Sequence, residues 1–226
     1  MTTPTVMITI TPMTTDGAGL LLTQWLSPAF PLGSFGWSHG LEQVVAEGEV
    51  TDAATLQRFL ETVLFHGAGR SDTILLAAAH RSDAAELADI ADIAQALAPS
   101  AERRDETLEQ GAAFARTTRE VWGLALPDMA LPVAVGRAAR LMDQPLTPTA
   151  RLYLQAMLSN LIQAAQRLMA LGQTDGQRIL ARLTAAIPAQ ADSLTDLGID
   201  DLGTFTPALD AASMRHETLQ PRLFRS

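Results

Sequence analysis

TPTARLYLQAMLSNLIQAAQRL, residues 147–168, carries apolar side chains at alternating spacings of four and three residues: Leu154, Leu158, Leu161, Ala165 and Leu168. This spacing places them along one face of an α-helix. Thr147 followed by Pro148 is typical of an N-cap and the first helical position. We therefore expect this stretch to form the central helix of the core.

The composition of the 226-residue chain favours helices throughout. The sequence contains 38 alanines and 33 leucines but 8 valines and 9 isoleucines, and hydrophobic residues make up 47% of it. Alanine and leucine favour helices, whereas β-branched residues favour strands. The chain has no cysteine and hence no disulfide, but it is long enough to bury a substantial core without one. We predict an all-α protein, a single-domain bundle of roughly ten helices with flexible N- and C-terminal tails.

Capping residues, prolines and glycines divide the rest of the chain. We expect helices over residues 20–26, 41–48, 53–66, 73–81, 84–97, 101–122, 133–142 and 175–187, and a short one from 207. Asp72 is the expected cap of the fourth of these, and Thr174 with Gln177 the capping box of the 175–187 helix, which Pro188 ends. Gly111 lies inside the 101–122 helix, where a neighbouring helix can approach closely.

The two ends of the chain differ in character from its middle. Residues 1–19 are rich in threonine and proline and read as a flexible N-terminal tail without the features of a signal peptide. Residues 20–212 form the expected helical domain. Residues 213–226 combine charge with large apolar groups and read as a C-terminal partner-binding tail, with a tail packed back on its own domain as the alternative.

Charge and hydropathy exclude several classes of partner. The net charge is −9, which argues against binding to nucleic acid or to anionic lipid. The most apolar stretch, residues 124–135, is interrupted by two prolines and an aspartate, so we expect no membrane span. Together with the lack of a targeting segment, this predicts a cytoplasmic protein. All 16 basic residues are arginine, and without lysine the chain has no P-loop lysine or Schiff base.

No constellation of residues points to catalysis. Ser38, His39 and Glu42 match a triad by residue type only, because adjacent side chains on a helix point to different faces. Glu102, Asp105 and Glu106 read as a solvated, dipole-favoured helix start. The four histidines are scattered and do not match a metal motif, which leaves His39 and His216, repeated across a dimer axis, as weak metal candidates.

Four segments together resemble one family, the UreF urease accessory proteins. They are SPAFPLGSFGWSHGLE (residues 27–42), SAERR (100–104), NLIQAAQRLMALGQTDGQ (160–177) and SMRHETLQPRLFRS (213–226). Two details depart from the family pattern: ALGQ, ending at Gln173, replaces a proline-containing turn, and Gln220-Pro221 replaces a tyrosine-serine pair. The resemblance spans nearly the whole chain from Leu20.

This resemblance implies an all-helical, non-catalytic homodimer without a cofactor of its own. Such a protein binds UreD (also called UreH) and recruits the GTPase UreG, which binds GTP. Through that complex it acts on the urease apoprotein, and GTP hydrolysis is coupled to nickel insertion.

The resemblance also implies which residues meet partners. Glu42 and Arg167 match positions facing the GTPase, and the tail becomes ordered when UreD binds. The full set expected to bind partners is Glu42, Arg167, Gln173, Arg215, His216, Glu217, Arg222, Leu223, Phe224 and Arg225. Phe35, Trp37 and Ser38 form a turn expected to serve the dimer or a partner, although aromatic residues beside a turn are as often local core. Arg167 has a plain alternative as a solvated helix charge.

Two other classes of function stay open from the residues alone. A helical enzyme of unknown substrate requires perturbed histidines or carboxylates gathered in one pocket. A direct nickel-binding chaperone requires converging histidine or carboxylate ligands.

Overall fold

The computed structural model describes residues 15–226, and within them the regular structure is entirely helical. Eleven α-helices and two 3-10 helices follow one another: α1 (Thr15–Trp25), η1 (Ser34–Gly36), α2 (Leu41–Ala46), α3 (Ala53–His66), α4 (Ala68–Arg81), α5 (Ala84–Ala96), α6 (Ala101–Trp122), α7 (Leu131–Leu141), α8 (Leu146–Leu168), α9 (Gln173–Thr184), α10 (Ile187–Leu194), η2 (Ile199–Asp201) and α11 (Pro207–His216). The predicted all-α class is confirmed. None of the helices in this range is long and apolar enough to cross a membrane.

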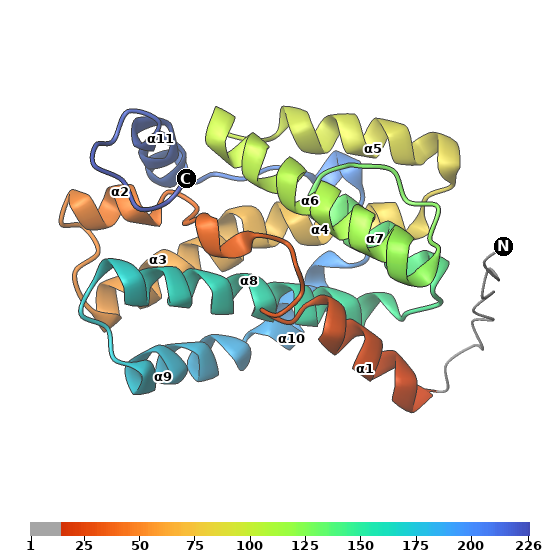
Figure 1. Ribbon diagram of the computed structural model, residues 1–226, viewed down its shortest axis with the longest axis horizontal. Coiled ribbons are helices and arrows are strands. Elements are labelled where there is room, and N and C mark those ends of the chain that lie inside the picture. Colours follow the sequence, from red (N-terminus) through yellow and green to blue (C-terminus); the bar gives the residue numbers. More distant parts are fainter. Residues whose placement is uncertain (1–14) are drawn as a thin grey trace, which may run out of the picture.

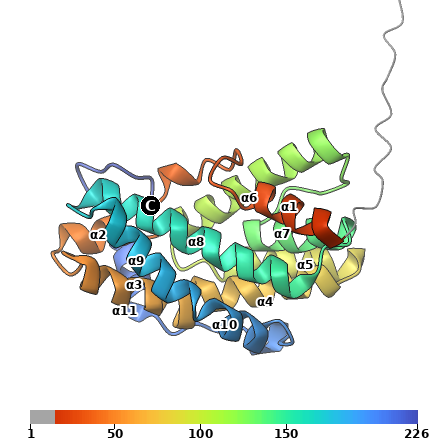
Figure 2. The same cartoon turned by 90° about the horizontal axis from the view of Figure 1, so that it is seen from below.

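Helix α8 runs through the middle of the bundle and packs against α1, α2, α3, α4, α7, α9 and α10 (Figure 1, Figure 2). Leu154, Leu158 and Ala165 are fully buried and Leu161 nearly so, while Leu168 is partly buried against the same core. The predicted central helix is thus confirmed. It begins two residues earlier than expected, because Pro145 rather than Thr147 is its N-cap, and Thr147 lies within the first turn.

Small residues allow α7 to pack closely on α4 and α6. A Cβ atom on Gly136 would lie 2.2 Å from the carbonyl oxygen of Leu76 in α4. A Cβ atom on Gly111 of α6 would lie 1.9 Å from the carbonyl oxygen of Met129, just before α7. The close approach predicted at Gly111 is therefore present, and its partner is the backbone that leads into α7.

Two capping predictions were wrong. Helix α4 begins at Ala68, one turn before Asp72, because Gly69 allows the backbone of Leu64 to come within 2.5 Å of where a Cβ atom would be and so brings α4 directly after α3. Helix α9 begins at Gln173 without the expected capping box. Pro188 does not end a helix but occupies the first turn of α10, where its missing N–H is harmless.

The ends of the chain also differ from expectation. Helix α1 starts at Thr15 rather than Leu20, and the rest of the predicted N-terminal tail lies outside the described residues. Ser213 is in α11, and residues 217–226, which we call the C-terminal segment, pack against the domain. Phe224 is 2% exposed and joins the core cluster. The flexible C-terminal tail is therefore corrected to the alternative, a segment packed on its own domain.

The Gly111 contact generates a stability prediction. Replacing Gly111 by alanine forces a methyl group into backbone atoms that cannot rotate away, so we expect a loss of about 1–3 kcal/mol in the free energy of unfolding. The measurement is urea denaturation. Gly203→Ala is the control, since no atom lies within 4 Å of its Cβ position, and equal stability of the two variants would contradict the packing argument.

Candidate functional site

The C-terminal segment brings together residues from all four sequence segments that carry the family resemblance. It lies beside α2 and the N-terminal half of α6, and Phe224 reaches Arg167 near the end of α8 (Figure 1). Between them, Arg225 N donates to the carbonyl oxygen of Gly36 in η1 over 2.9 Å. One continuous surface is thus built from parts of the chain more than 100 residues apart.

Glu42 on α2 is the central acceptor of this surface. Its carboxylate accepts the backbone N–H of Leu223 at 2.6 Å and that of Phe224 at 2.8 Å. The same group faces Nε2 of His216 at 3.0 Å, and the residue is only 7% exposed. A buried carboxylate is tolerated when donors surround it, so Glu42 and the docked segment stabilise each other.

Helix α2 reaches this position because of Gly40. Gly40 has φ of +75°, a left-handed conformation that favours glycine, and its Cβ position is 3.3 Å from the backbone of Ser213 in α11. A side chain there is disfavoured both by conformation and by space. The Gly-Leu-Glu sequence after Gly40 therefore fixes α2 against α11 with Glu42 facing the segment.

Helix α6 contributes three carboxylates at spacings of four and three residues. Glu102 pairs with Nη1 of Arg222 at 2.5 Å and faces Nδ1 of His216 at 2.7 Å. Glu106 accepts the hydroxyl of Ser226 at 2.9 Å, and Glu109 forms a two-point pair with Arg225 at 2.5 and 2.7 Å. This spacing puts the three carboxylates on one helix face, opposite the cations of the segment.

The expectation of a solvated acidic helix start was therefore wrong for Glu102 and Glu106. Glu106 is 7% exposed and also pairs with Arg103. The periodicity of Glu102, Glu106 and Glu109 was the signal available in the sequence, but it carried no information about the segment that covers these carboxylates.

Aromatic side chains complete the attachment of the segment. The guanidinium of Arg225 lies 4.3 Å from the ring centre of Trp37, and that of Arg167 lies 4.4 Å from the ring centre of Phe224. Arg167 also donates to the carbonyl oxygen of Phe35 at 2.5 Å, so it is more than a solvated helix charge. Trp37 is buried and acts as local core, whereas Phe35 is 75% exposed.

The remaining predicted site residues divide into two groups. Ser38, Arg215 and Glu217 take part in the attachment: Ser38 N donates to the main-chain oxygen of Ser226 at 2.7 Å, Arg215 pairs with Glu47 at 2.7 Å, and Glu217 accepts the N–H of Ala101 at 2.9 Å. Gln173 is exposed at the start of α9, where it accepts from Gln166 at 3.2 Å, and none of its hydrogen bonds reaches the segment. Leu223 is 54% exposed.

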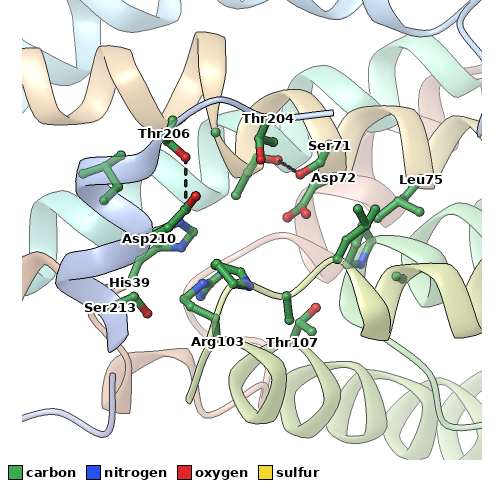
Figure 3. A pocket seen from close by; sticks show the side chains of 18 of the residues that line it. His39, Ser71, Asp72, Leu75, Arg103, Thr107, Thr204, Thr206, Asp210 and Ser213 are labelled. Carbon is green, nitrogen blue, oxygen red and sulfur yellow. Dashed lines mark hydrogen bonds between the residues drawn. The ribbon is translucent and has the colours of Figure 1, made fainter. Parts of the chain in front are cut away.

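A hollow lined by both polar and apolar side chains was not anticipated from the sequence. Figure 3 shows Asp72 projecting from α4 and Arg103 from α6 toward the same space, which His39 and Thr107 also line. A second hollow, which reaches Tyr153 on α8, shares these four residues. Asp72 lies inside α4 rather than at its cap, and its Oδ2 accepts a hydrogen bond from the hydroxyl oxygen of Tyr153, 2.7 Å away.

Burial shifts the ionisation of groups around the hollow. It raises the pKa of Asp72 from 3.8 to about 6, although the Tyr153 hydroxyl and Arg103 act in the opposite direction. Burial and the charge of Arg103 both lower the pKa of His39. The hollow thus holds a carboxyl that changes charge near neutral pH and an imidazole that resists protonation.

The histidines and the triad-like residues do not form a reactive centre. His39 lines the hollow, while both ring nitrogens of His216 face carboxylates on different helices. Residues 15–226 hold no group of three or more histidine, aspartate or glutamate side chains placed to bind a metal ion. Ser38 Oγ donates to the Ser226 main-chain oxygen and accepts from Glu42 N, so it is not directed toward His39.

These features define an all-helical protein whose C-terminal segment is attached to α2, α6 and α8 of its own domain. Comparison with known proteins gives the family. The UreF family model matches residues 50–184. The urease accessory protein UreF of Roseobacter denitrificans is 49% identical over 95% of this chain and 96% of its own length. The UreF of Ruegeria sp. is 52% identical over 94% of this chain and its full length, and that of Rhodopseudomonas palustris 47% identical over 93% and 95%. The chain belongs to the UreF family of urease accessory proteins.

Glu42 generates a prediction for the attachment of the segment. Glu42→Gln keeps the size of the side chain but turns one acceptor into a donor facing backbone N–H groups or His216, so we expect a loss of about 1–3 kcal/mol in unfolding free energy. Faster hydrogen exchange at the amides of Leu223 and Phe224 should accompany it. Glu49→Gln, exposed just after α2, is the control, and unchanged exchange at both amides would refute the role of Glu42.

Asp72 generates a prediction for pH dependence. Because its folded pKa is raised, its contribution to stability is fully present below about pH 3.8 and is lost as the pH rises through about 6. Asp72→Asn cannot ionise, so its unfolding free energy should rise relative to the natural chain by about 1–3 kcal/mol between about pH 4 and about pH 7.5. Urea denaturation at both pH values measures this. The control Asp89→Asn, at an exposed position, should show no such trend. A difference in unfolding free energy between Asp72→Asn and the natural chain that stays constant with pH would contradict the raised pKa of Asp72.

Proposed function

We propose that this chain is a non-catalytic scaffold for maturation of the nickel enzyme urease. It binds UreD/UreH and recruits and regulates the GTPase UreG, so that GTP hydrolysis is coupled to nickel insertion into the urease apoprotein. It works in the cytoplasm as a homodimer and needs no cofactor of its own, because nickel is the cargo of the complex and GTP is bound by UreG. Membership of the UreF family supports the link to urease.

The observation that carries the scaffold role is the surface around the C-terminal segment. Two large apolar side chains, Phe35 and Leu223, are 75% and 54% exposed there. Two guanidinium groups lie close by: that of Arg167 donates to the carbonyl oxygen of Phe35 and lies over the ring of Phe224, and that of Arg225 lies over the ring of Trp37. Exposed aromatic and aliphatic groups beside arginines are typical of residues that dominate protein interfaces.

The segment is already folded in the chain on its own, which favours a binding role. Attachment of residues 222–226 presents Leu223 and Arg225 in fixed positions. A partner that meets an ordered surface does not bear the entropic cost of ordering it. The proposal therefore places UreD or UreG against a preformed surface rather than a tail that folds on binding.

Regulation of UreG sets a further requirement. A scaffold changes the distribution between two states of a partner only when it binds them with different affinities. We therefore propose that the GTP-bound and GDP-bound forms of UreG differ in affinity for the complex that contains this chain.

The test uses the full chain co-expressed with the UreD-type and UreG-type proteins of its own source. We expect the natural chain to form a ternary complex in size-exclusion chromatography with light scattering. Phe35→Glu combined with Leu223→Glu should lose at least one partner, because charges replace exposed apolar contacts without entering the core.

A matched control separates the surface from a general effect of charge. Val121→Glu alters a side chain that is 50% exposed at the far end of α6, about 18 Å along the helix from Glu109. The Val121→Glu variant should bind both partners as the natural chain does. If the natural chain binds neither protein, the scaffold proposal is wrong. If the double variant Phe35→Glu with Leu223→Glu binds both proteins, the partner-binding surface lies elsewhere on the molecule.

A further inference from the structure

His216 is a buried ring held between two acidic side chains. It is the last residue of α11 and is 0% exposed. Nε2 lies 3.0 Å from Oε2 of Glu42 on α2, and Nδ1 lies 2.7 Å from Oε2 of Glu102 on α6. A neutral imidazole has one N–H donor and one lone pair, whereas the imidazolium has two donors. Only the charged ring therefore satisfies both carboxylates.

The charges around the ring balance only when it is protonated. Arg222 of the C-terminal segment pairs with the other oxygen of Glu102, and Glu42 and Glu102 supply two negative charges. Arg215 and Glu217, the neighbours of His216 in sequence, are engaged with Glu47 and the Ala101 N–H. With a neutral ring, two carboxylates share one guanidinium, and a nitrogen lone pair faces a carboxylate oxygen in a buried place.

His216 also stands where the C-terminal segment begins. The carboxylate that it contacts on α2 is the one that accepts the N–H groups of Leu223 and Phe224. The carboxylate that it contacts on α6 is the one that holds Arg222. The end of α11 favours a cation through the helix dipole. The ring thus orients both acceptors that attach the segment.

We propose that His216 is a proton-dependent clasp for the C-terminal segment. As an imidazolium it bridges Glu42 and Glu102 and keeps residues 217–226 attached. When the ring loses its charge, the segment detaches, and Leu223 and Arg225 lose the positions that their backbone hydrogen bonds to Glu42 and Gly36 give them. This inference rests on the proposed function, because it makes the protonation of one histidine regulate the surface offered to UreD and UreG.

The first test measures the isolated full chain, with no partner present. Amide hydrogen exchange at Leu223 and Phe224, corrected for intrinsic rates, is followed from about pH 6 to about pH 9, with Leu158 in the core as the internal reference. We expect protection of the two amides to fall at least about tenfold while that of Leu158 stays level. Protection that does not change with pH would overturn the clasp.

Variants separate a charge effect from loss of packing. His216→Gln should lower the protection of both amides at about pH 6 and remove its pH dependence. If the ring acted by packing alone, the natural chain would show no pH dependence, and His216→Gln would lower the protection by the same factor at every pH, which would contradict a role for its charge. His66→Gln, exposed at the end of α3, is the control.

One measurement does not depend on whether His216→Gln folds. The ¹⁵N chemical shifts of the ring in the natural chain distinguish imidazolium from either neutral tautomer, and a neutral ring in the attached state at about pH 6 would refute the clasp directly. Since none of these readouts involves a partner, failure of the clasp and failure of the scaffold role give different results.

Discussion

A single buried carboxylate, that of Glu42, determines whether the C-terminal segment has a place on this molecule. Its two oxygens accept two consecutive backbone amides and face one imidazole, and these contacts link residues 174 to 182 positions apart in sequence. Removal of the segment would leave the carboxylate beside the empty site of the Phe224 ring and without its two backbone N–H donors. Because desolvating an unpaired charge is costly, α2 and the segment are stable together and not separately.

The contacts of the C-terminal segment also account for part of the charge distribution of the chain. A net charge of −9 gives a surface that repels anionic partners, yet the carboxylates of α6 are neutralised where the arginines of the segment lie. Arginine suits this role because its planar group pairs with a carboxylate at two points and stacks on an aromatic ring at the same time, as Arg225 does with Glu109 and Trp37. A lysine at that position would keep the charge and lose the geometry.

The sequence was sufficient to predict elements that depend on local interactions. Helices α3 and α5 begin at residues 53 and 84 as predicted, with Asp52 and Asp83 as their N-caps, and the apolar stripe of α8 is buried as its periodicity requires. The predictions for Pro188 and Asp72 were wrong because the roles of these residues depend on tertiary context. Pro188 lies in the first turn of α10, and Asp72 accepts a hydrogen bond from Tyr153. Sequence spacing identifies which residues share a helix face, but it does not identify what covers that face.

The same limit explains what was learned about the candidate site. The family resemblance selected many of the residues that meet in space, although not the carboxylates of α6. It also implied a tail that becomes ordered when UreD binds, whereas the contacts of Glu42, Arg167 and Trp37 order it within the chain. This changes the physical argument for recognition. A surface assembled from four distant pieces of sequence exists only when the whole bundle is folded and the segment is attached, so a partner that binds it selects the folded molecule. The affinity of that partner then depends on the equilibrium of attachment, because a surface populated for part of the time binds with proportionally lower apparent affinity.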